Sequence, residues 1–254
     1  MAVILQTILS CKLKHMNLIL LEPNLSLSEG RYALSERQQS HIHHVIQAKS
    51  GDVLRVGLLG EQLGEGVYQA ASSDLPAHIH SLQLTQAPPK ALPMVLVMAL
   101  PRPNMLKRTL HNITAMGVKE LYLIHSAKVE KSYWQSPVLQ SESIHQILLE
   151  GLEQAKDTIM PNYTMVPRFR PFVEDQLPDI LVGKMGLLAH PYQASACPVD
   201  LQEPCVLALG PEGGWNEFEV SKWLEAGMSA VHLGQRILKV ETAVPVLLSR
   251  LYPA

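Results

Sequence analysis

The stretch Pro204–Glu219, PCVLALGPEGGWNEFE, determines how the second half of this 254-residue chain is organised. An apolar run breaks on a Gly-Pro-Glu-Gly-Gly loop, and a polar stretch follows. Asn216 is predicted to cap the next helix, with Glu219 as its capping-box partner. Glycine lets a backbone approach a ligand closely, and Pro211 stiffens the turn. The pattern indicates a ligand site at the carboxyl end of a strand, with a purely structural turn as the alternative.

The glycine loop does not match the common nucleotide-binding motifs. It is not G-x-G-x-x-G, and it lacks the Lys-Ser/Thr pair of a phosphate loop. It also lies late in the chain, whereas dinucleotide-binding folds usually carry theirs after the first strand of the sheet. An NAD- or phosphate-binding enzyme is therefore a remote alternative.

Strand-like and helix-like segments alternate around this loop. The predicted strands span residues 94–100, 120–125, 186–190, 205–209 and 230–233. The predicted helices span residues 103–116, 137–156, 217–225 and 243–251. Alternation of this kind is typical of a parallel α/β sheet.

The N-terminal part has a different texture. Residues 16–85 consist of short β-like runs with frequent turns and one predicted helix over 35–48, capped by Ser35 with Gln38 as its partner. This pattern predicts a small β-rich barrel or sandwich, and residues 86–90 read as a linker. The histidines of HIHH, residues 41–44, do not share one helical face, so we predict a core histidine rather than a metal site.

Composition allows one large core or two modest ones, because 47% of the residues are hydrophobic and 17% are charged. The net charge of −2 gives no hint of nucleic acid, but residues 86–132 hold seven Lys/Arg against two acidic residues. That excess is either a basic patch or a solvated helix face.

The sequence predicts a cytoplasmic protein. Cys11, Cys197 and Cys205 lack metal spacing and are expected to be buried, reduced thiols. The first fifteen residues lack the basic start of a signal peptide, and Met16 reads as a natural beginning. No later segment is apolar for long enough to predict a membrane span.

A second loop unit follows the first, at Val231–Ala243, VHLGQRILKVETA. Together the two units resemble the RsmE-type 16S ribosomal RNA uracil-N3 methyltransferases of the SPOUT superfamily. That family carries a Gly-Pro-Glu-Gly-Gly loop and, further on, a Leu-Gly-x-Arg-Ile-Leu-Arg-x-Glu-Thr-Ala stretch. Weaker likeness covers Met105–Ser126, Leu152–Pro161 and Leu187–Pro191.

The resemblance implies an α/β trefoil knot, the SPOUT methyltransferase domain, over residues 91–254. It also implies a β-rich, PUA-like RNA-binding barrel over residues 16–85. The expected protein is a cytoplasmic homodimer that binds S-adenosylmethionine and methylates N3 of a uridine in small-subunit (16S) ribosomal RNA. Neither a metal nor a membrane is expected to take part.

Carried over to this chain, the resemblance implies that three segments bind the cofactor, largely through backbone groups. Their residues are Leu188, Ala189, His190, Leu209, Gly210, Pro211, Glu212, Gly213, Gly214, Leu233, Gly234, Ile237 and Leu238. The predicted catalytic residues are Glu241 and Arg236, with Glu212 as an alternative base for the N3 proton. The predicted RNA-binding residues are Arg102, Lys107, Arg108 and Lys239. Trp215 has two interpretations, a contact to the sulfonium or a core position.

The chain departs from the family at positions that face RNA. His44-Val-Ile-Gln47 stands where arginines are usual, no arginine follows Glu153-Gln154, and Lys239-Val240 replaces the common Arg-Thr. Lysine cannot reproduce the bidentate fork of arginine. Two alternatives therefore stay open: a methyltransferase for another RNA site, and an RNA-binding or ribosome-assembly protein with weakened catalysis.

Overall fold

A computed structural model describes residues 18–28 and 30–253 of the chain. The chain forms two compact units. The first unit contains the described residues up to Pro89 together with Leu152–Met160, and the second contains Lys90–Gly151 and the described residues from Pro161 onward. Cys11 and the proposed start at Met16 lie outside the described residues.

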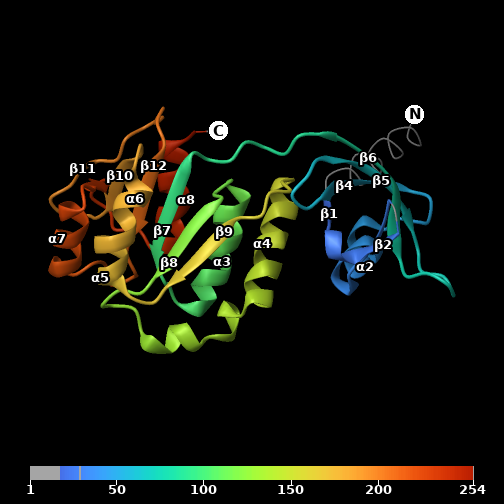
Figure 1. The fold of residues 1–254 in the computed structure, drawn as a ribbon, viewed down its shortest axis with the longest axis horizontal. Coiled ribbons are helices and arrows are strands. Elements are labelled where there is room, and N and C mark those ends of the chain that lie inside the picture. Colours follow the sequence, from blue (N-terminus) through green and yellow to red (C-terminus); the bar gives the residue numbers. More distant parts are fainter. Residues whose placement is uncertain (1–17, 29, 254) are drawn as a thin grey trace. The chain divides into compact units, whose positions relative to one another are not determined.

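The described part of the first unit forms a six-stranded sheet with the order β1-β4-β5-β6-β3-β2 (Figure 1). Its strands are β1 (Ile19–Leu21), β2 (Ser26–Ser28), β3 (Arg31–Ala33), β4 (Val53–Leu58), β5 (Leu63–Gln69) and β6 (His78–Gln86). Its helical elements are η1 (Pro23–Leu25), α2 (Glu36–His41) and η2 (Ile42–Ile46). Only β1 and β4 pair in parallel, and the other described pairs of this sheet are antiparallel.

The helix of the first unit begins with the predicted capping box. The Ser35 hydroxyl accepts from the Gln38 N–H, and the Gln38 side chain accepts from the Ser35 N–H at 3.1 Å. The prediction of a core histidine in HIHH is wrong, because His41 is only half-buried and His43 and His44 are exposed. Ile42 and Ile46, four residues apart on the same helical face, are the buried pair instead.

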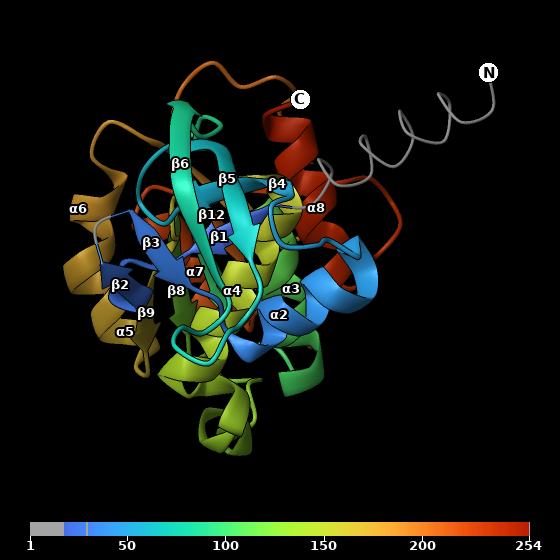
Figure 2. The ribbon, with the colours of Figure 1, turned by 90° about the vertical axis from the view of Figure 1, so that its right-hand side faces the viewer.

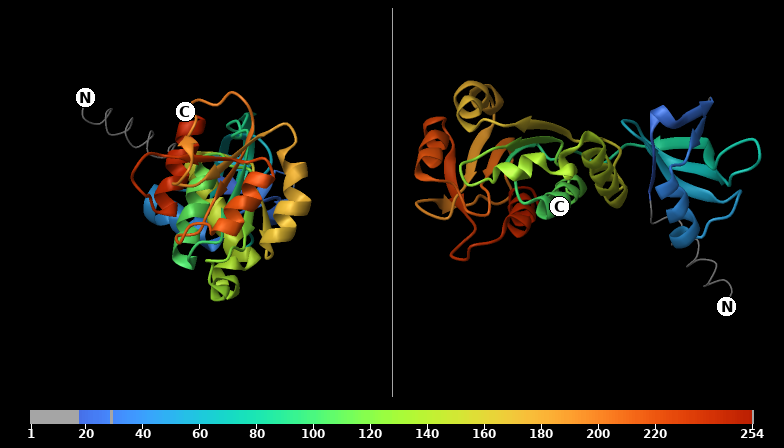
Figure 3. Two further views of the ribbon diagram at one scale, coloured as in Figure 1. Left: turned by 90° about the vertical axis from the view of Figure 1, so that its left-hand side faces the viewer. Right: turned by 90° about the horizontal axis from the view of Figure 1, so that it is seen from below.

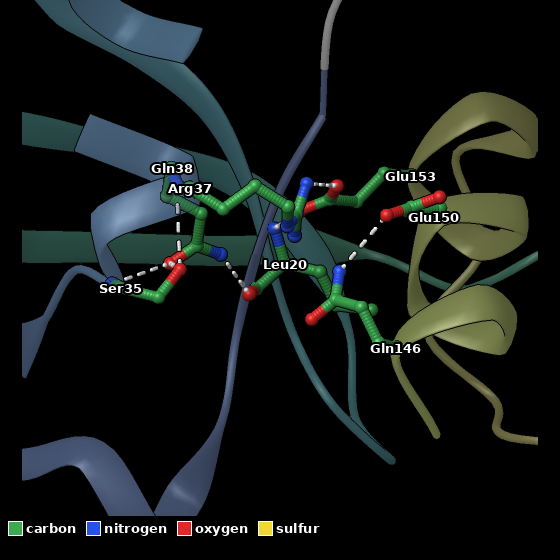
Figure 4. Close-up of polar contacts among 7 residues, drawn as sticks. All are labelled: Leu20, Ser35, Arg37, Gln38, Gln146, Glu150 and Glu153. Carbon is green, nitrogen blue, oxygen red and sulfur yellow. Dashed lines mark hydrogen bonds and ion pairs between the residues drawn. The ribbon is translucent and has the colours of Figure 1, made fainter. Parts of the chain in front are cut away.

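A segment from far along the chain completes the first unit (Figure 4). The Glu153 carboxylate, at the end of α4 (Ser141–Ala155), binds the Arg37 guanidinium through two bonds of 2.6 and 3.1 Å. The same carboxylate accepts from the Leu20 N–H at 3.3 Å, while the Leu20 carbonyl accepts from Gln38 at 2.7 Å. Glu153 thus binds α2 through a bidentate, charge-assisted contact with Arg37 and binds β1 through the Leu20 N–H.

Thr158, from the same late segment, forms further hydrogen bonds with the first unit. Its hydroxyl donates to the Glu61 carbonyl, and its own carbonyl accepts from the Gly60 N–H at 2.8 Å. A Cβ on Gly57 would lie 2.7 Å from the Thr158 methyl carbon, so β4 requires a glycine where this segment passes. The first unit is therefore built from two stretches of sequence rather than one.

The described part of the second unit forms a seven-stranded sheet with the order β11-β13-β10-β12-β7-β8-β9. Its strands are β7 (Met94–Ala99), β8 (Glu120–Ile124), β9 (Asn162–Val166), β10 (Met185–Ala189), β11 (Ser195–Ala196), β12 (Cys205–Leu209) and β13 (Ser229–His232). All described strand pairs of this sheet are parallel, which confirms the predicted parallel α/β arrangement.

Helices cover both faces of this sheet, as a parallel sheet requires. Figures 2 and 3 show α3 (Pro103–Ala115) and α8 (Val240–Leu251) on one face, with α5 (Phe169–Pro171) and α6 (Leu177–Leu181) on the other. Helix α7 (Glu217–Glu225) packs with η5 (Phe172–Gln176). Short 3-10 turns η3 (Lys131–Gln135) and η4 (Pro137–Leu139) precede α4.

Several boundaries differ from the sequence prediction. The predicted helix over 137–156 is a 3-10 turn followed by α4, because Gln140 takes an extended backbone between them. The segments β9, α5, η5 and α6 had not been predicted. Their stretch mixes prolines and charged residues with isolated apolar ones, so no regular period stands out.

Within residues 18–28 and 30–253, no helix is long and apolar enough to cross a membrane. Cys197 and Cys205 are free and buried, as predicted.

The Glu153 contact predicts a measurable stability effect. Glu153→Gln removes the charge that binds Arg37, and we expect a loss of about 1–3 kcal/mol in the stability of the first unit, typical of a hydrogen bond to a charged group. Hydrogen–deuterium exchange should show faster exchange in β1 and α2. The exposed Glu61→Gln serves as the control, and equal exchange in the two variants would contradict a structural role for Glu153.

Candidate functional site at the carboxyl edge of the parallel sheet

Three neighbouring strands bring the predicted cofactor segments to one edge of the sheet. β10 lies between β12 and β13 and is parallel to both. These strands lead into His190, Gly210 and Leu233 respectively. Because the carboxyl ends of neighbouring parallel strands lie side by side, residues 188–190, 209–214 and 233–238 gather there, where ligands bind in open α/β sheets.

Two glycines shape the loop after β12. Gly214 has a φ of +67°, and its N–H donates to the Pro211 carbonyl at 2.8 Å, which closes a tight turn. A Cβ on Gly210 would lie 3.2 Å from the indole of Trp215, closer than ordinary contact. Gly210 therefore lets the backbone pass directly beside this ring.

Trp215 occupies a core position, which confirms the second of its two interpretations. Only 5% of it is exposed. Its ring centroid lies 5.4 Å from that of Trp223 and 6.1 Å from that of Phe169. Its Nε1 is buried and has no hydrogen-bond partner among the described residues. An unsatisfied donor beside Gly210 is the kind of group that a bound ligand can satisfy.

The loop after β8 is bonded to the glycine loop. Glu219 is only 2% exposed and forms the predicted capping box with Asn216, in which the two backbone N–H groups donate at 2.7 and 3.0 Å. Its other contact is long-range: the Ala127 N–H donates to the Glu219 carboxylate at 2.7 Å. One buried carboxylate therefore joins two loops at this edge of the sheet.

Lys128 adds a second connection between these loops. Its Nζ donates to the Gly213 carbonyl at 2.8 Å and lies 3.5 Å from the Trp215 carbonyl oxygen. A Cβ on Gly213 would lie 3.0 Å from the Lys128 Cδ, so the aliphatic stem runs along the loop. Sequence reasoning had placed Lys128 only in a general basic region, because nothing local connects residues 128 and 213.

The Glu212 side chain faces the start of α3. Its carboxylate accepts from the Arg102 N–H at 3.2 Å. Arg102 is the N-cap of α3 and has no capping side chain of its own. A carboxylate at this position satisfies a free donor and interacts favourably with the positive end of the helix dipole. This contact gives the Glu212 side chain a structural role, which argues against its use as a base.

An open depression of about 1060 Å³ lies next to this contact. It collects several predicted residues, namely Arg102, Arg108 and Lys239 from the RNA-binding set and Glu241 from the catalytic pair. The depression is also lined by Pro103, Asn104, Met105, Glu130, Tyr133 and Glu212. Three cationic and three carboxylate side chains make it a site of mixed charge rather than a purely basic surface.

Glu130 and Tyr133 are the ionisable lining residues that sequence reasoning missed. The Tyr133 hydroxyl donates to the Glu130 carboxylate at 3.2 Å. Partial burial raises the pKa of Tyr133, Glu130 raises that pKa further, and the nearby Arg102 guanidinium opposes the change. Tyr133 therefore stays protonated and remains a donor at neutral pH.

The other predicted residues lie outside the depression. Lys107 and Arg236 are exposed and do not line it. Ile237 is 76% exposed, whereas Leu233 and Leu238 are half-buried. Gly234 has a φ of +111°, so the loop after β13 needs glycine at this turn.

His190 lies at the centre of the edge and is predicted to be neutral at physiological pH. Desolvation by burial lowers the pKa of its imidazole. The backbone N–H of His190 donates to the Val231 carbonyl at 3.0 Å, which continues the pairing of β10 with β13. In the described part of the chain, no group of three or more His, Cys, Asp or Glu is arranged to hold a metal ion.

The Lys128 contact predicts a local effect on the glycine loop. Lys128→Met keeps the aliphatic stem and removes the donor, so we expect amide exchange at Gly213–Trp215 to rise by roughly two- to tenfold. Hydrogen–deuterium exchange measures this directly. The exposed Lys131→Met is the matched control, and an unchanged loop in Lys128→Met would show that the contact does not hold the loop.

Comparison with known proteins places these features in a family. A family model described as an RNA methyltransferase domain matches residues 88–252. Ribosomal RNA small subunit methyltransferase E of Treponema pallidum is 28% identical over 90% of this chain and 87% of its own length. The protein of the same name from Synechocystis is 26% identical over 88% of this chain and 73% of its own length.

Solved structures share the fold. A methyltransferase from Legionella pneumophila, in complex with the cofactor SAM, matches with a TM-score of 0.72 at 17% identity, covering 91% of this chain and 95% of its own. Ribosomal RNA small subunit methyltransferase E from Neisseria gonorrhoeae, bound to S-adenosyl methionine, matches with a TM-score of 0.70 at 20% identity. The match covers 92% of this chain and 96% of that protein. The family model matches well over half of the residues of this chain, so the chain belongs to the RNA methyltransferase domain family.

Proposed function

We propose that this protein uses S-adenosylmethionine to methylate N3 of a uridine in small-subunit ribosomal RNA. One observation carries the proposal: in a member of the RNA methyltransferase family, the three motif segments meet at one edge of a parallel sheet. The names of the relatives from Treponema pallidum and Synechocystis support ribosomal RNA as the substrate. Two structural relatives with bound SAM support the cofactor.

The residues at the edge suit this cofactor. The three glycines of the loop Gly210–Gly214 let its backbone approach a ligand closely, and the buried Trp215 Nε1 beside it lacks a hydrogen-bond partner among the described residues. His190, kept neutral by burial, adds no positive charge that would repel a sulfonium. The exposed Ile237 and half-buried Leu233 and Leu238 offer apolar surface for the adenine ring.

The family resemblance extends the proposal to architecture. We infer that residues 91–254 form a trefoil-knot methyltransferase domain and residues 16–85 a PUA-like RNA-binding barrel. We infer further that the protein works as a homodimer in the cytoplasm. The likeness in fold to the two SAM-bound structures along more than nine-tenths of the chain supports a shared architecture, while the dimer and the location rest on the family resemblance alone.

The chemistry asks two things of the protein. When bound, S-adenosylmethionine supplies a methyl group whose S–C bond breaks as the N3–C bond forms, and a neutral thioether leaves. The chain must therefore remove the N3 proton and hold the resulting uracil anion in line with the methyl group. Glu241 is our candidate base, because it lines the depression and is half-buried there. Arg236 and Lys239 are suited to hold RNA phosphates.

A catalytically weakened RNA-binding protein is the second candidate. The observation that favours it is the absence of family arginines at exposed positions, where this chain has His44 and Gln47. A methyltransferase for a different RNA site accounts for the same observation.

Cofactor binding tests the first step of the proposal. Isothermal titration with S-adenosylmethionine should show saturable binding to the wild type. Gly213→Val should weaken that binding at least tenfold, because the new side chain meets the Lys128 stem and disturbs the loop. Thr164→Val, exposed on β9, is the control and should bind normally. Equal affinity in all three proteins would place the cofactor elsewhere.

The role of Glu241 predicts a defect in turnover. Glu241→Gln should lower kcat by about 10²–10⁴-fold, the usual contribution of a general base, and leave cofactor affinity nearly unchanged. Mass spectrometry of nucleosides from treated ribosomal RNA would measure N3-methyluridine. Glu217→Gln, in the first turn of α7, controls for loss of a carboxylate at a helix start. Normal turnover in Glu241→Gln would reject Glu241 as the base.

A further inference from the structure

A hydrogen-bonded pair of side chains lines the depression together with Arg102. The Glu130 carboxylate accepts from the Tyr133 hydroxyl at 3.2 Å, and the Arg102 guanidinium is near enough to Tyr133 to oppose the rise in that residue's pKa. All three residues line the depression. A carboxylate and a hydroxyl that face the same depression are suited to orient a guanidinium there, and an oriented guanidinium loses less entropy with each new hydrogen bond it makes.

The backbone of Arg102 is held as well. Its N–H donates to Glu212, which belongs to the glycine loop, at 3.2 Å. Arg102 is thus held through its backbone by one loop of the site, and its side chain lines the same depression as Tyr133 of η3. Neither contact was visible in the sequence, because residues 102, 133 and 212 are far apart along the chain.

The turn that carries Tyr133 is itself anchored at the sheet edge. The next residue, Trp134, donates from Nε1 to Nδ1 of His125 at 2.9 Å, and His125 follows β8 directly. The Tyr133 N–H also donates to the Glu130 carbonyl at 3.0 Å, so Glu130 and Tyr133 belong to one hydrogen-bonded turn. Such support is what a positioned polar group needs, since small displacements weaken its effect on a reaction.

The ligand that fits this arrangement is a uracil ring. Removal of the N3 proton leaves a negative charge shared by the ring nitrogen and the two flanking carbonyl oxygens. A positioned guanidinium presents N–H donors to such an oxygen and stabilises the charge as it develops. The depression as a whole balances three carboxylates against three cationic groups, so it suits an uncharged base, and the phosphates that flank this base are left to Arg236 and Lys239.

We propose that Arg102 binds a carbonyl oxygen of the target uracil and stabilises its anion, and that Tyr133 and Glu130 are positioning residues for Arg102. This inference rests on the proposed function. It adds the recognition of the reacting base, which the motif loops alone do not provide. Glu241 accepts the N3 proton in this arrangement, while Arg102 shares the charge that the proton leaves behind.

Substitution of Tyr133 tests the inference. Tyr133→Phe and Glu130→Gln should each lower kcat for uridine methylation by about 5- to 50-fold while the Kd for S-adenosylmethionine stays within twofold of wild type. The loss should shrink as pH rises, because a less stabilised uracil anion needs a higher pH to form. This shift of the pH–rate profile is a readout that general destabilisation does not produce.

The chain offers a matched control. Tyr122 donates to Glu120 at 3.2 Å, the same kind of pair at the same distance, at the opposite, amino end of β8. Tyr122→Phe and Glu120→Gln should therefore retain wild-type kcat and an unshifted pH profile. Unfolding midpoints of all four variants separate loss of stability from loss of positioning.

Three outcomes would overturn the inference. Wild-type turnover in Tyr133→Phe would show that Arg102 needs no positioning. Weaker RNA binding in Tyr133→Phe or Glu130→Gln, at unchanged kcat and with a salt dependence reduced by about one counterion, would assign Arg102 to a phosphate. A wild-type protein that methylates no uridine would overturn the proposed function together with this inference, whereas the first two outcomes leave the proposed function intact.

Discussion

The buried carboxylate of Glu219 is the contact on which the candidate site depends. One of its oxygens accepts from the Asn216 N–H in the capping box of α7, and the other accepts from the Ala127 N–H. It therefore fixes both the end of the glycine loop and the loop after β8. A carboxylate that is only 2% exposed is expensive to bury unless its oxygens are satisfied, and here backbone donors satisfy them. The arrangement is therefore strongly specified, because moving either loop would leave one oxygen of a buried carboxylate without its donor.

The rest of the site is built outward from this contact. Lys128 follows Ala127 and reaches the Gly213 carbonyl, and Glu212 reaches the start of α3. The glycine loop is consequently attached to elements that follow β7 and β8 as well as to its own strand. Backbone groups that are held in this way suit a cofactor recognised mainly through the main chain, because little ordering remains to be done on binding.

Local signals were readable in the sequence. The capping boxes at Ser35 and Asn216 were predicted because the partners lie three residues apart, and the parallel sheet was predicted because buried strands alternate with helices. The meeting of the three motif segments followed from the same parallel arrangement. The proposed trefoil knot, by contrast, rests only on family resemblance, since no hydrophobic period encodes how a chain threads.

Long-range contacts were not readable. Glu153 binds Leu20 across 133 residues, and Arg102 meets Glu212 across 110, so no local pattern indicates either pair. Glu130 and Tyr133 lie in a short 3-10 turn between regular elements, where periodicity carries no signal. A core histidine was expected in HIHH, but Ile42 and Ile46 occupy the buried face of this helix, so His43 and His44 lie on its exposed face.

The central claim is that the carboxyl edge of the parallel sheet holds the methyl donor. A crystal structure of the protein with S-adenosylmethionine tests it most directly. The account predicts density for the cofactor against Gly210–Gly214 and residues 233–238, with a polar atom at the Trp215 Nε1. Ordered cofactor at any other surface, with these loops empty at saturating concentration, would contradict it.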